Sequence, residues 1–443
     1  MKRKLEKELI EWKNRDEYLP LLLRGARQVG KSYLVEYFGK NYFENIIKID
    51  FEKSPELSRC FKTRDPVEIT KEIEVTLEQK IIPGKTLLFL DEIQECPNAL
   101  ISLRYFRELM GDLHVIAAGS LMEFLLNNEK YSFPVGRVEF LYLRPFSFEE
   151  FLEELAPIAY QRLQSITLKK PLSEVEHIEL LKWVKKYFFI GGMPDAIKKY
   201  KSSNSFLECQ KVHRRILHAY ESDFGQYSEH VQHKFLQMIF LKTPALIGQI
   251  LKYTNIDKET RSRDLKPAIH LLSSAGLIQQ VFATTASGIP LHAHVREHRF
   301  KLLFLDIGLL QTALQVDAGD FFEKDIMQIN AGMLAEQFVG QEILANDLPD
   351  QNRSLLFWER EKNGHAEIDF IKTIDSQIIP IEVKAGATGT LRSLKSFLKL
   401  KRSPFGIRIS ENDLSFYDQI LSIPLYLTSK MNYLTLQVLK KNY

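Results

Sequence analysis

The sequence is poor in cysteine and contains no long hydrophobic run. Its three cysteines, Cys60, Cys96 and Cys209, lie far apart and form no C-x-x-C pair, which argues against a disulfide framework and against a zinc ribbon. No stretch approaches the roughly 18 apolar residues of a membrane-spanning helix. The charged N-terminal residues 1–18 lack the apolar stretch of a signal peptide. We therefore expect a cytoplasmic protein with no membrane partner.

Net charge is also nearly absent. The 443 residues include 60 lysines and arginines and 57 aspartates and glutamates, so the formal net charge is only +3. Composition alone therefore does not indicate a nucleic-acid-binding protein, and any basic surface must be local. Hydrophobic residues make up 45% and charged residues 26%, which is typical of a globular protein. A chain of this length is expected to form about two to four domains.

The first third of the chain alternates short apolar runs with helical stretches. Apolar runs of this kind are typical of a parallel sheet that is covered on both faces. The expected strands are Leu19–Arg24, Ile46–Phe51, Thr86–Leu90, His114–Ala118 and Arg137–Leu143. We predict an α/β domain over residues 1–150. The mostly helical pattern that follows predicts a helical lid over residues 151–225.

A glycine-rich motif follows the first expected strand and precedes a helix, and it matches G-x-x-x-x-G-K-S/T. Its residues are Gly25, Ala26, Arg27, Gln28, Val29, Gly30, Lys31 and Ser32. Glycines let the backbone N–H groups point at phosphates, and the helix adds the positive end of its dipole. We expect Lys31 to neutralise the β- and γ-phosphates of ATP and Ser32 to offer its hydroxyl to Mg²⁺.

A strand that ends in two acids completes the expected ATP site. The apolar residues 87–90 are followed by Asp91 and Glu92. One carboxylate at such a strand end can hold the Mg²⁺ shell, and its neighbour can orient or deprotonate the attacking water. We assign Asp91 to Mg²⁺ and Glu92 to the water. The alternative is that both acids are solvated and simply precede the helix at Pro97. ATP hydrolysis is the expected activity.

Ser120 follows the expected strand His114–Ala118. A small polar residue at this place can sense the γ-phosphate from the strand next to the acids. It can equally cap the helix that follows. The sequence leaves both interpretations open.

These motifs carry a resemblance to a known family. GARQVGKS, LLFLDEIQECP, AAGS and GRVEFLYLRPFSFEEF resemble AAA-type ATPases of a widespread prokaryotic family, in which a C-terminal domain of uncharacterised role follows the ATPase domain. The resemblance continues through YFFIGGMPDAI, KLLFLDIGLL, GMLAEQFVGQEIL, FWEREKNGHAEIDFI and IPIEVKAG, and so covers nearly the whole chain. AAA-type ATPases commonly work as oligomers, which leaves a homo-oligomer open for this chain.

Arg137 matches a position of the family that resembles an arginine placed near the nucleotide. It could neutralise transition-state charge in cis or across a subunit interface. The alternative is an arginine at the start of a strand that pairs with an acid such as Glu139. Both interpretations stay open.

The middle of the chain predicts a winged helix over residues 226–315. Helices, the last of them Arg261–Ala275, precede the expected strands Gln280–Ala283 and Lys301–Leu305. Basic residues on this helix and hairpin could contact DNA phosphates, or the module could form an internal or partner interface. They are Arg261, Arg263, Lys266, His292, His294, Arg296, His298, Arg299 and Lys301. The spacing of the three histidines also suggests a metal site, against solvated histidines as the alternative.

Two acids and a lysine gather in the C-terminal segment, residues 325–443. Asp369 lies in the expected strand Ala366–Thr373, whereas Glu382 and Lys384 share one face of the next strand. Two carboxylates with a lysine suit phosphodiester cleavage that depends on Mg²⁺. The pattern resembles the PD-(D/E)xK nuclease superfamily, with Glu336 as a further match. The resemblance implies catalytic roles for Asp369, Glu382 and Lys384, and metal ligation by Glu336, Asp369 and Glu382. The alternative is a surface ion network.

The sequence thus predicts an α/β fold class: a P-loop parallel-sheet ATPase domain with a helical lid, a winged helix and a restriction-endonuclease-like α/β domain. The function expected first is an ATPase that uses ATP and Mg²⁺ to drive or switch an action on DNA, with a metal-dependent nuclease site. The second is an ATP-gated protein-interaction switch whose nuclease-like domain is inactive.

Overall fold

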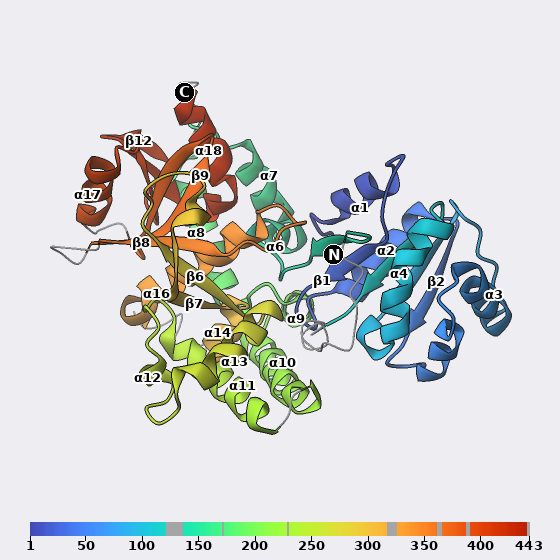
Figure 1. Cartoon of the computed structure of the whole chain (residues 1–443). Coiled ribbons are helices and arrows are strands. Elements are labelled where there is room, and N and C mark those ends of the chain that lie inside the picture. Colours follow the sequence, from blue (N-terminus) through green and yellow to red (C-terminus); the bar gives the residue numbers. More distant parts are fainter. Residues whose placement is uncertain are drawn as a thin grey trace.

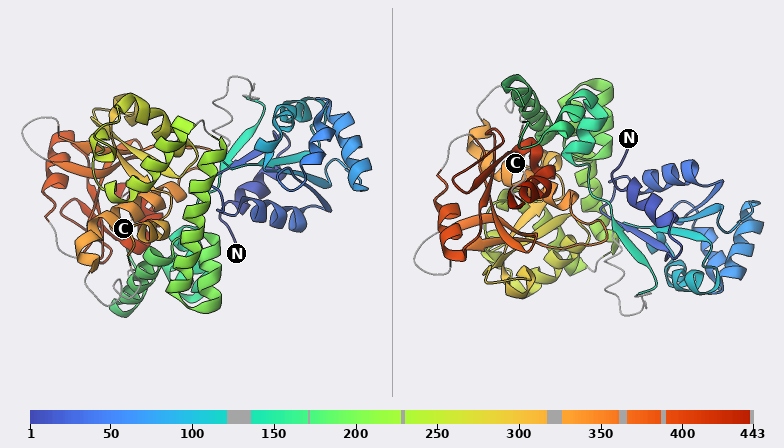
Figure 2. Two further views of the ribbon diagram at one scale, coloured as in Figure 1. Left: turned by 90° about the horizontal axis from the view of Figure 1, so that it is seen from below. Right: turned by 90° about the horizontal axis from the view of Figure 1, so that it is seen from above.

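The computed structural model describes residues 1–120, 136–170, 172–227, 230–316, 326–360, 366–386 and 390–440. Figure 1 shows an N-terminal lobe, coloured blue to cyan, beside a larger body that contains the rest of the chain. The two further views in Figure 2 show the same arrangement from below and from above. Within the described ranges, no helix has both the length and the apolar character needed to cross a membrane.

The N-terminal lobe is built on a five-stranded sheet in the order β2-β3-β4-β1-β5, in which all paired strands are parallel. The strands are β1 (Leu21–Arg24), β2 (Asn45–Asp50), β3 (Thr86–Asp91), β4 (His114–Ala118) and β5 (Glu139–Tyr142). The helices are α1 (Glu6–Lys13), α2 (Lys31–Tyr42), α3 (Pro66–Leu77) and α4 (Pro97–Leu109). The parallel sheet expected from the apolar runs is confirmed.

Alternate residues of these strands enter two separate hydrophobic clusters. Leu21 and Leu23 belong to one cluster, and Leu22 belongs to the other. Successive side chains of a strand point to opposite faces, so both faces of the sheet are covered. This two-sided burial explains why the strands have continuous apolar runs rather than an alternating pattern.

The larger body begins with a mainly helical segment. Its helices up to the second sheet are α6 (Phe148–Leu155), α7 (Pro157–Ser165), α8 (Glu174–Ile190), α9 (Pro194–Ser203), α10 (Phe206–Tyr227), α11 (His230–Lys242), α12 (Tyr253–Ile256) and α13 (Ser262–Ser274). Capping boxes start two of them: Ser147 with Glu150 at α6, and Ser173 with Glu176 at α8.

An eight-stranded sheet forms the centre of the larger body, in the order β12-β13-β11-β10-β9-β8-β6-β7. Its strands are β6 (Ile278–Thr284), β7 (Val295–Phe304), β8 (Leu355–Glu359), β9 (Glu367–Ile374), β10 (Gln377–Val383), β11 (Gly406–Ser410), β12 (Ser415–Tyr417) and β13 (Ile420–Pro424). The helices of this part are α14 (Ile307–Ala313), α16 (Ile326–Ala345), α17 (Arg392–Lys401) and α18 (Met431–Leu439).

This sheet crosses the boundary that we expected between residues 315 and 325. The expected order of helices followed by a hairpin is present, because α11 and α13 precede β6 and β7, which pair in antiparallel fashion. However, β6 also pairs with β8 in parallel, with Val281 opposite Leu355. The hairpin is therefore one end of the sheet that contains the C-terminal strands. Parallel pairing between distant segments leaves no local pattern in the sequence.

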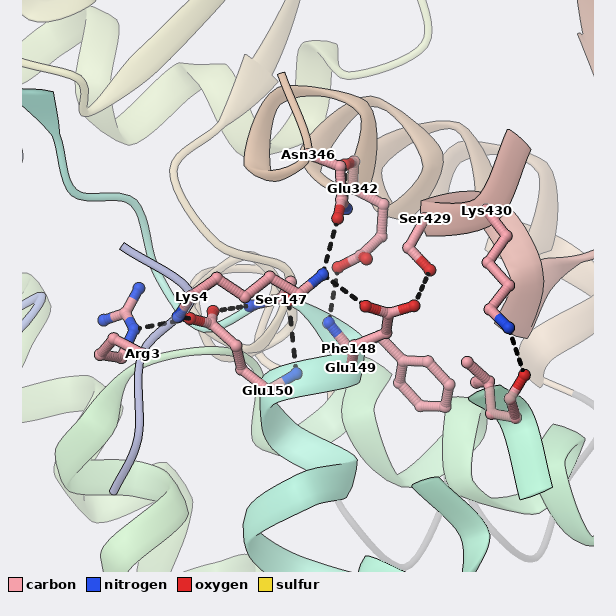
Figure 3. A network of polar contacts seen from close by, with 11 residues as sticks. Arg3, Lys4, Ser147, Phe148, Glu149, Glu150, Glu342, Asn346, Ser429 and Lys430 are labelled. Carbon is pink, nitrogen blue, oxygen red and sulfur yellow. Dashed lines mark hydrogen bonds and ion pairs between the residues drawn. The ribbon is translucent and has the colours of Figure 1, made fainter. Parts of the chain in front are cut away.

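Helix α6 is held by residues from distant parts of the chain, as the polar network in Figure 3 shows. Lys4 Nζ lies 2.5 Å from Glu149 Oε2, and Ser429 Oγ donates to Glu149 Oε1 at 2.6 Å. The backbone N–H of Phe148 donates to Glu342 Oε1 of α16 at 2.8 Å. These contacts fasten the N-terminal residues to the larger body.

Candidate nucleotide-binding site

The sheet order gathers the expected ATP-site residues at one edge of the N-terminal sheet. The loop of residues 25–32 follows β1, Asp91 ends β3, and Ser120 comes two residues after the end of β4. The strands are parallel and β4 lies between β3 and β1, so all three segments leave the sheet at its carboxyl edge. Ligands of open α/β sheets bind at this edge.

The loop itself has the backbone that phosphate binding requires. Gly25 has φ +142°, Gln28 has φ 66°, and Gly30 has φ 96° as the N-cap of α2. A Cβ atom at Gly25 would lie only 2.2 Å from the carbonyl oxygen of Leu143, so no larger residue fits there. The loop therefore curves around the N-terminus of α2, where N–H groups without helical partners can face an anion.

Lys31 points back into this curve. Its Nζ donates to the carbonyl oxygens of Gly25 at 2.9 Å and of Ala26 at 3.0 Å. The residue is only 6% exposed. Both of these acceptors are neutral carbonyl groups, and hydrogen bonds to neutral groups are weaker than charge-assisted ones, so a phosphate oxygen can replace them.

Ser32 and Asp91 are in direct contact. Ser32 Oγ donates to Asp91 Oδ1 at 3.0 Å, and Lys48 Nζ of β2 lies 2.8 Å from Asp91 Oδ2. Burial raises the pKa of Asp91, and the hydrogen bonds from Lys48 and Ser32 oppose that rise. A hydroxyl and a carboxylate oxygen this close together are the kind of oxygen ligands that Mg²⁺ prefers, so these two residues fit such an ion. The sequence does not indicate that Lys48 contacts Asp91.

Glu92 turns away from the strand with φ 48°, a conformation that costs about 1 kcal/mol or more in residues other than glycine. Its Oε2 accepts hydrogen bonds from Gln94 Nε2 at 2.7 Å and from Ser120 Oγ at 3.3 Å. Ser120 is therefore a partner of Glu92. The alternative role of Ser120 as a helix cap concerns residues 121–135, which lie outside the described residues.

Arg27 connects the loop to α10, a connection that sequence analysis did not reveal. Its Nη1 lies 2.5 Å from Asp223 Oδ1, and its carbonyl oxygen accepts from the Tyr220 hydroxyl at 2.6 Å. On the other side of the loop, Arg3 Nη1 donates to the carbonyl oxygen of Val29 at 3.0 Å. Burial raises the pKa of Asp223, and Arg27 opposes that rise. The loop is thus held from two sides by distant residues.

Arg137 lies away from this site. Its Nε is 3.6 Å from Glu108 Oε1, so Arg137 pairs with an acid as the alternative interpretation expects, but that acid is Glu108, whereas Glu139 pairs with Arg15 at 2.7 Å. Glu139 is opposite Leu21 in the parallel pairing of β5 with β1, which places Arg137 beyond the amino end of β1. The loop leaves the opposite end, so an action on the same subunit's nucleotide does not fit. A role across a subunit interface stays a prediction.

Two acids of the C-terminal segment lie on adjacent strands, and Lys384 follows the last residue of the second strand, β10, directly. Asp369 is on β9 and Glu382 on β10, and Lys384 Nζ lies 2.6 Å from Glu382 Oε1. Asp369 Oδ2 accepts from the backbone N–H of Val383 at 2.8 Å. Burial raises the pKa of Glu382 to about 7, with a further rise from the charge of Asp369 and an opposing effect of Lys384.

A buried lysine lies among these acids. Lys301 Nζ is 2.8 Å from Glu336 Oε1 and 3.7 Å from Asp369 Oδ1, and it also pairs with Glu367. The side chain of Lys301 is 1% exposed, so the expected role of this residue in contacting DNA is wrong. Within the described parts of the chain, no three His, Cys, Asp or Glu residues are arranged to hold a metal ion. The expected ligand set of Glu336, Asp369 and Glu382 does not fit a metal as a group of three.

The three histidines of the hairpin do not share a strand face. His292 and His294 belong to a short 3-10 turn (Leu291–His294), and only His298 lies within β7. They are also absent from any metal-binding group within the described residues. The strand chelate expected for His292 and His294 is therefore wrong, because the strand begins after both.

The parallel sheet and the loop at its carboxyl edge define a P-loop nucleotide-binding domain. Residues 17–152 match the family model of an AAA domain. Residues 181–320 match a domain of unknown function (DUF8612), and residues 331–427 match another (DUF4143). The chain thus contains an AAA-type ATPase domain followed by two segments whose families have no assigned function.

Similar proteins add little to this assignment. An uncharacterized protein of Methanocaldococcus jannaschii is 26% identical over 189 residues, which are 41% of this chain and 38% of that protein. The alignment therefore covers less than half of the relative's length. The Orc1 protein of Aeropyrum pernix in complex with DNA is 12% identical, with 71% of this chain and 91% of that chain covered and a TM-score of 0.28.

A second solved structure, PCH-2 of C. elegans, is 14% identical over 44% of this chain and 60% of that chain, with a TM-score of 0.27. A signal transduction ATPase with a tetratricopeptide repeat sensor from Pyrococcus horikoshii is 12% identical over 79% and 46%, with a TM-score of 0.26. Scores this low support no argument, and the fold is assigned from the strand order and the loop.

Proposed function

We propose that this protein is a Mg²⁺-dependent ATPase. The observation that carries the proposal is the meeting of three segments at one edge of the sheet: the loop with Lys31, the Ser32–Asp91 hydrogen bond, and the Glu92–Ser120 contact. Lys31 binds the β- and γ-phosphates, and Ser32 and Asp91 hold Mg²⁺, which supplies positive charge to the phosphates. Glu92 orients the attacking water, and Ser120 positions Glu92.

Glu92→Gln is the variant that tests this assignment. Glutamine keeps a hydrogen-bonding oxygen but cannot act as a base, so ATP should still bind within about threefold of wild type while phosphate release falls by roughly 100-fold or more. Phosphate release and binding of a fluorescent ATP analogue are measured in parallel. Glu95→Gln, three residues along the chain and exposed, is the matched control. Normal turnover in Glu92→Gln would show that another group activates the water.

The nucleotide state is passed to the larger body through α10. Tyr220 and Asp223 both contact Arg27, so a ligand that moves this part of the loop also acts on the helix. The ring of Tyr220 lies 6.1 Å from that of Phe240 on α11, and Phe240 lies 5.2 Å from Phe304 on β7. This chain of packed rings supports an ATP-gated switch in which the eight-stranded sheet responds to ATP.

DNA is a second candidate partner, favoured by the outer face of α13. Arg261, Arg263, Lys266 and His270 are all exposed there, although Asp264 lies 3.6 Å from Arg263. Exposed cations of this kind release counterions when they meet DNA phosphates. In a filter-retention assay, Arg263→Ala/Lys266→Ala should weaken binding and reduce its salt dependence. Lys7→Ala/Lys71→Ala, at exposed sites elsewhere, is the control. Equal retention by both double variants would remove α13 as a DNA contact.

A further inference from the structure

The carboxylates of the C-terminal segment surround a lysine that comes from outside that segment. Lys301 lies on β7, whereas Glu336 lies on α16, and Glu367 and Asp369 lie on β9. Its ammonium is 2.8 Å from Glu336 Oε1 and 3.7 Å from Asp369 Oδ1, and it also pairs with Glu367. One side chain thus connects three elements across the interval that separates the two segments of unknown function.

Lys301 remains charged in this position. Burial disfavours an ammonium, but three carboxylates contact this one: Glu336 at 2.8 Å, Asp369 at 3.7 Å, and Glu367. The ring of Phe357 lies 5.3 Å from Nζ and adds a cation–π contact. Removal of one partner from such a buried ion pair is strongly destabilising.

We propose that the Lys301 ammonium is the resident cation of this carboxylate cluster and takes the place where a divalent ion would contact Glu336 and Asp369. The cluster is then a structural joint between β7, α16 and β9. The cluster then couples the position of the hairpin to that of the C-terminal strands, and it does not cleave phosphodiester bonds. This inference concerns Lys301 and the carboxylates of the C-terminal segment, and it does not rest on ATP hydrolysis.

Glu382 lies next to this cluster, and one of its oxygens has no partner among the described residues. Glu382 Oε2 is buried and makes no hydrogen bond to the described residues, while Lys384 Nζ lies 2.6 Å from Oε1. Glu336 and Glu367 pair with Lys301, so among the described residues an ion at Glu382 Oε2 would have Asp369 as its second carboxylate. Direct measurement of metal binding therefore decides between a structural role of these residues and the metal-dependent cleavage expected from the sequence.

The test is a Mn²⁺ titration of the full-length protein without nucleotide, followed by electron paramagnetic resonance of the free ion. Comparison of wild type with Asp369→Asn isolates the C-terminal cluster, because any ion at the ATP site contributes equally to both. We expect the two binding curves to superpose at millimolar Mn²⁺. One additional Mn²⁺ bound by wild type would overturn the proposal.

Lys301→Ala provides the complementary arm. Removal of the ammonium leaves the carboxylates uncompensated, so this variant should gain one Mn²⁺ site that is lost again in Lys301→Ala/Asp369→Asn. Its midpoint of thermal unfolding should fall by roughly 10 °C. Lys372→Ala is the matched control, because Lys372 also lies in the sheet but is 21% exposed and pairs with Asp347 at 3.0 Å.

A folded Lys301→Ala protein that gains no Mn²⁺ site, or that is as stable as Lys372→Ala, contradicts the inference. If Lys301→Ala does not fold, the comparison of wild type with Asp369→Asn still decides.

Discussion

Two buried lysines of this protein, Lys31 and Lys301, have partners of different kinds. Lys31 donates to two neutral carbonyl oxygens of the loop, at 2.9 and 3.0 Å. Lys301 is enclosed by the carboxylates of Glu336, Glu367 and Asp369. A hydrogen bond to a neutral group contributes about 1 kcal/mol, whereas breaking a buried ion pair costs about 3–5 kcal/mol. The hydrogen bonds of Lys31 to Gly25 and Ala26 are therefore easier to exchange for a phosphate than the ion pairs of Lys301.

The acids of the two sites differ in the same way. Asp91 pairs with Lys48, which is 25% exposed, through Oδ2, and its Oδ1 accepts from a serine hydroxyl that can rearrange around an ion. Glu336 is hydrogen-bonded to a buried ammonium. The comparison teaches that a carboxylate and a lysine close in space do not by themselves define a catalytic site. What matters is whether an incoming ligand can replace the contacts that already exist.

Lys31→Ala is expected to have the largest effect on ligand binding. Loss of the ammonium removes the charge that faces the β- and γ-phosphates, so ATP affinity should fall by about 100-fold or more. The thermal stability should fall less than in Lys301→Ala, because the hydrogen bonds to Gly25 and Ala26 are made to neutral carbonyl oxygens. Calorimetric titration with ATP and thermal unfolding check both statements. Lys40→Ala, exposed on the same helix, is the control.

The comparison fails if Lys31→Ala binds ATP normally. It also fails if this variant loses as much stability as Lys301→Ala, because the two lysines would then both be structural.

The ATP site could be predicted because its signals are local. The eight residues 25–32 follow one strand directly, and Asp91 and Glu92 follow another. Parallel strands with short apolar runs bring such segments to one edge whatever the rest of the chain does. The N-terminal sheet was predictable for the same reason, since each strand is buried on both faces and therefore apolar throughout.

The contacts that join distant segments could not be predicted. Arg27 meets Asp223 across 196 positions, and Lys301 meets Glu336 across 35. The sequence pattern places Lys301 among the basic residues of a hairpin that was expected to be exposed. Its neighbours Phe300 and Leu302 are buried, and a single charge within such an apolar run is a signal of a buried ion pair. The pairing of β6 with β8 has no comparable signal.

Asp223→Asn is expected to have an intermediate effect on ATP hydrolysis. It tests whether the ATP site, like the Lys301 cluster, depends on an ion pair between distant residues. Asparagine cannot balance the Arg27 guanidinium, which lies 2.5 Å from Asp223 Oδ1. Arg27 should lose its fixed position in the phosphate-binding loop, so kcat for ATP hydrolysis should fall by about tenfold while ATP affinity changes less than about threefold. Asp195→Asn, in an exposed pair with Arg215, is the control. An equal loss of affinity and kcat would instead indicate general damage to the loop.

Glu342→Gln is expected to have the smallest effect, and it shows what a buried acid costs when no cation encloses it. Burial raises the pKa of Glu342 from 4.5 to about 8, although the N–H of Phe148 and the charge of Lys4 favour the ionised form. The folded state therefore holds this proton more tightly than the unfolded state does. Its stabilising effect is complete below about pH 4.5 and is lost as the pH rises through about 8.

Glutamine does not titrate, and its oxygen can still accept from Phe148, so the difference in unfolding midpoint between Glu342→Gln and wild type isolates this one carboxyl group. That difference should be near zero at acidic pH and should grow to a few degrees in favour of the variant above the pKa of about 8. Glu11→Gln, exposed on α1, accounts for the effect of the substitution chemistry itself. A difference that does not vary with pH would mean that the Glu342 carboxyl group has the same pKa in the folded and the unfolded state, so that Phe148 and Lys4 fully compensate its burial.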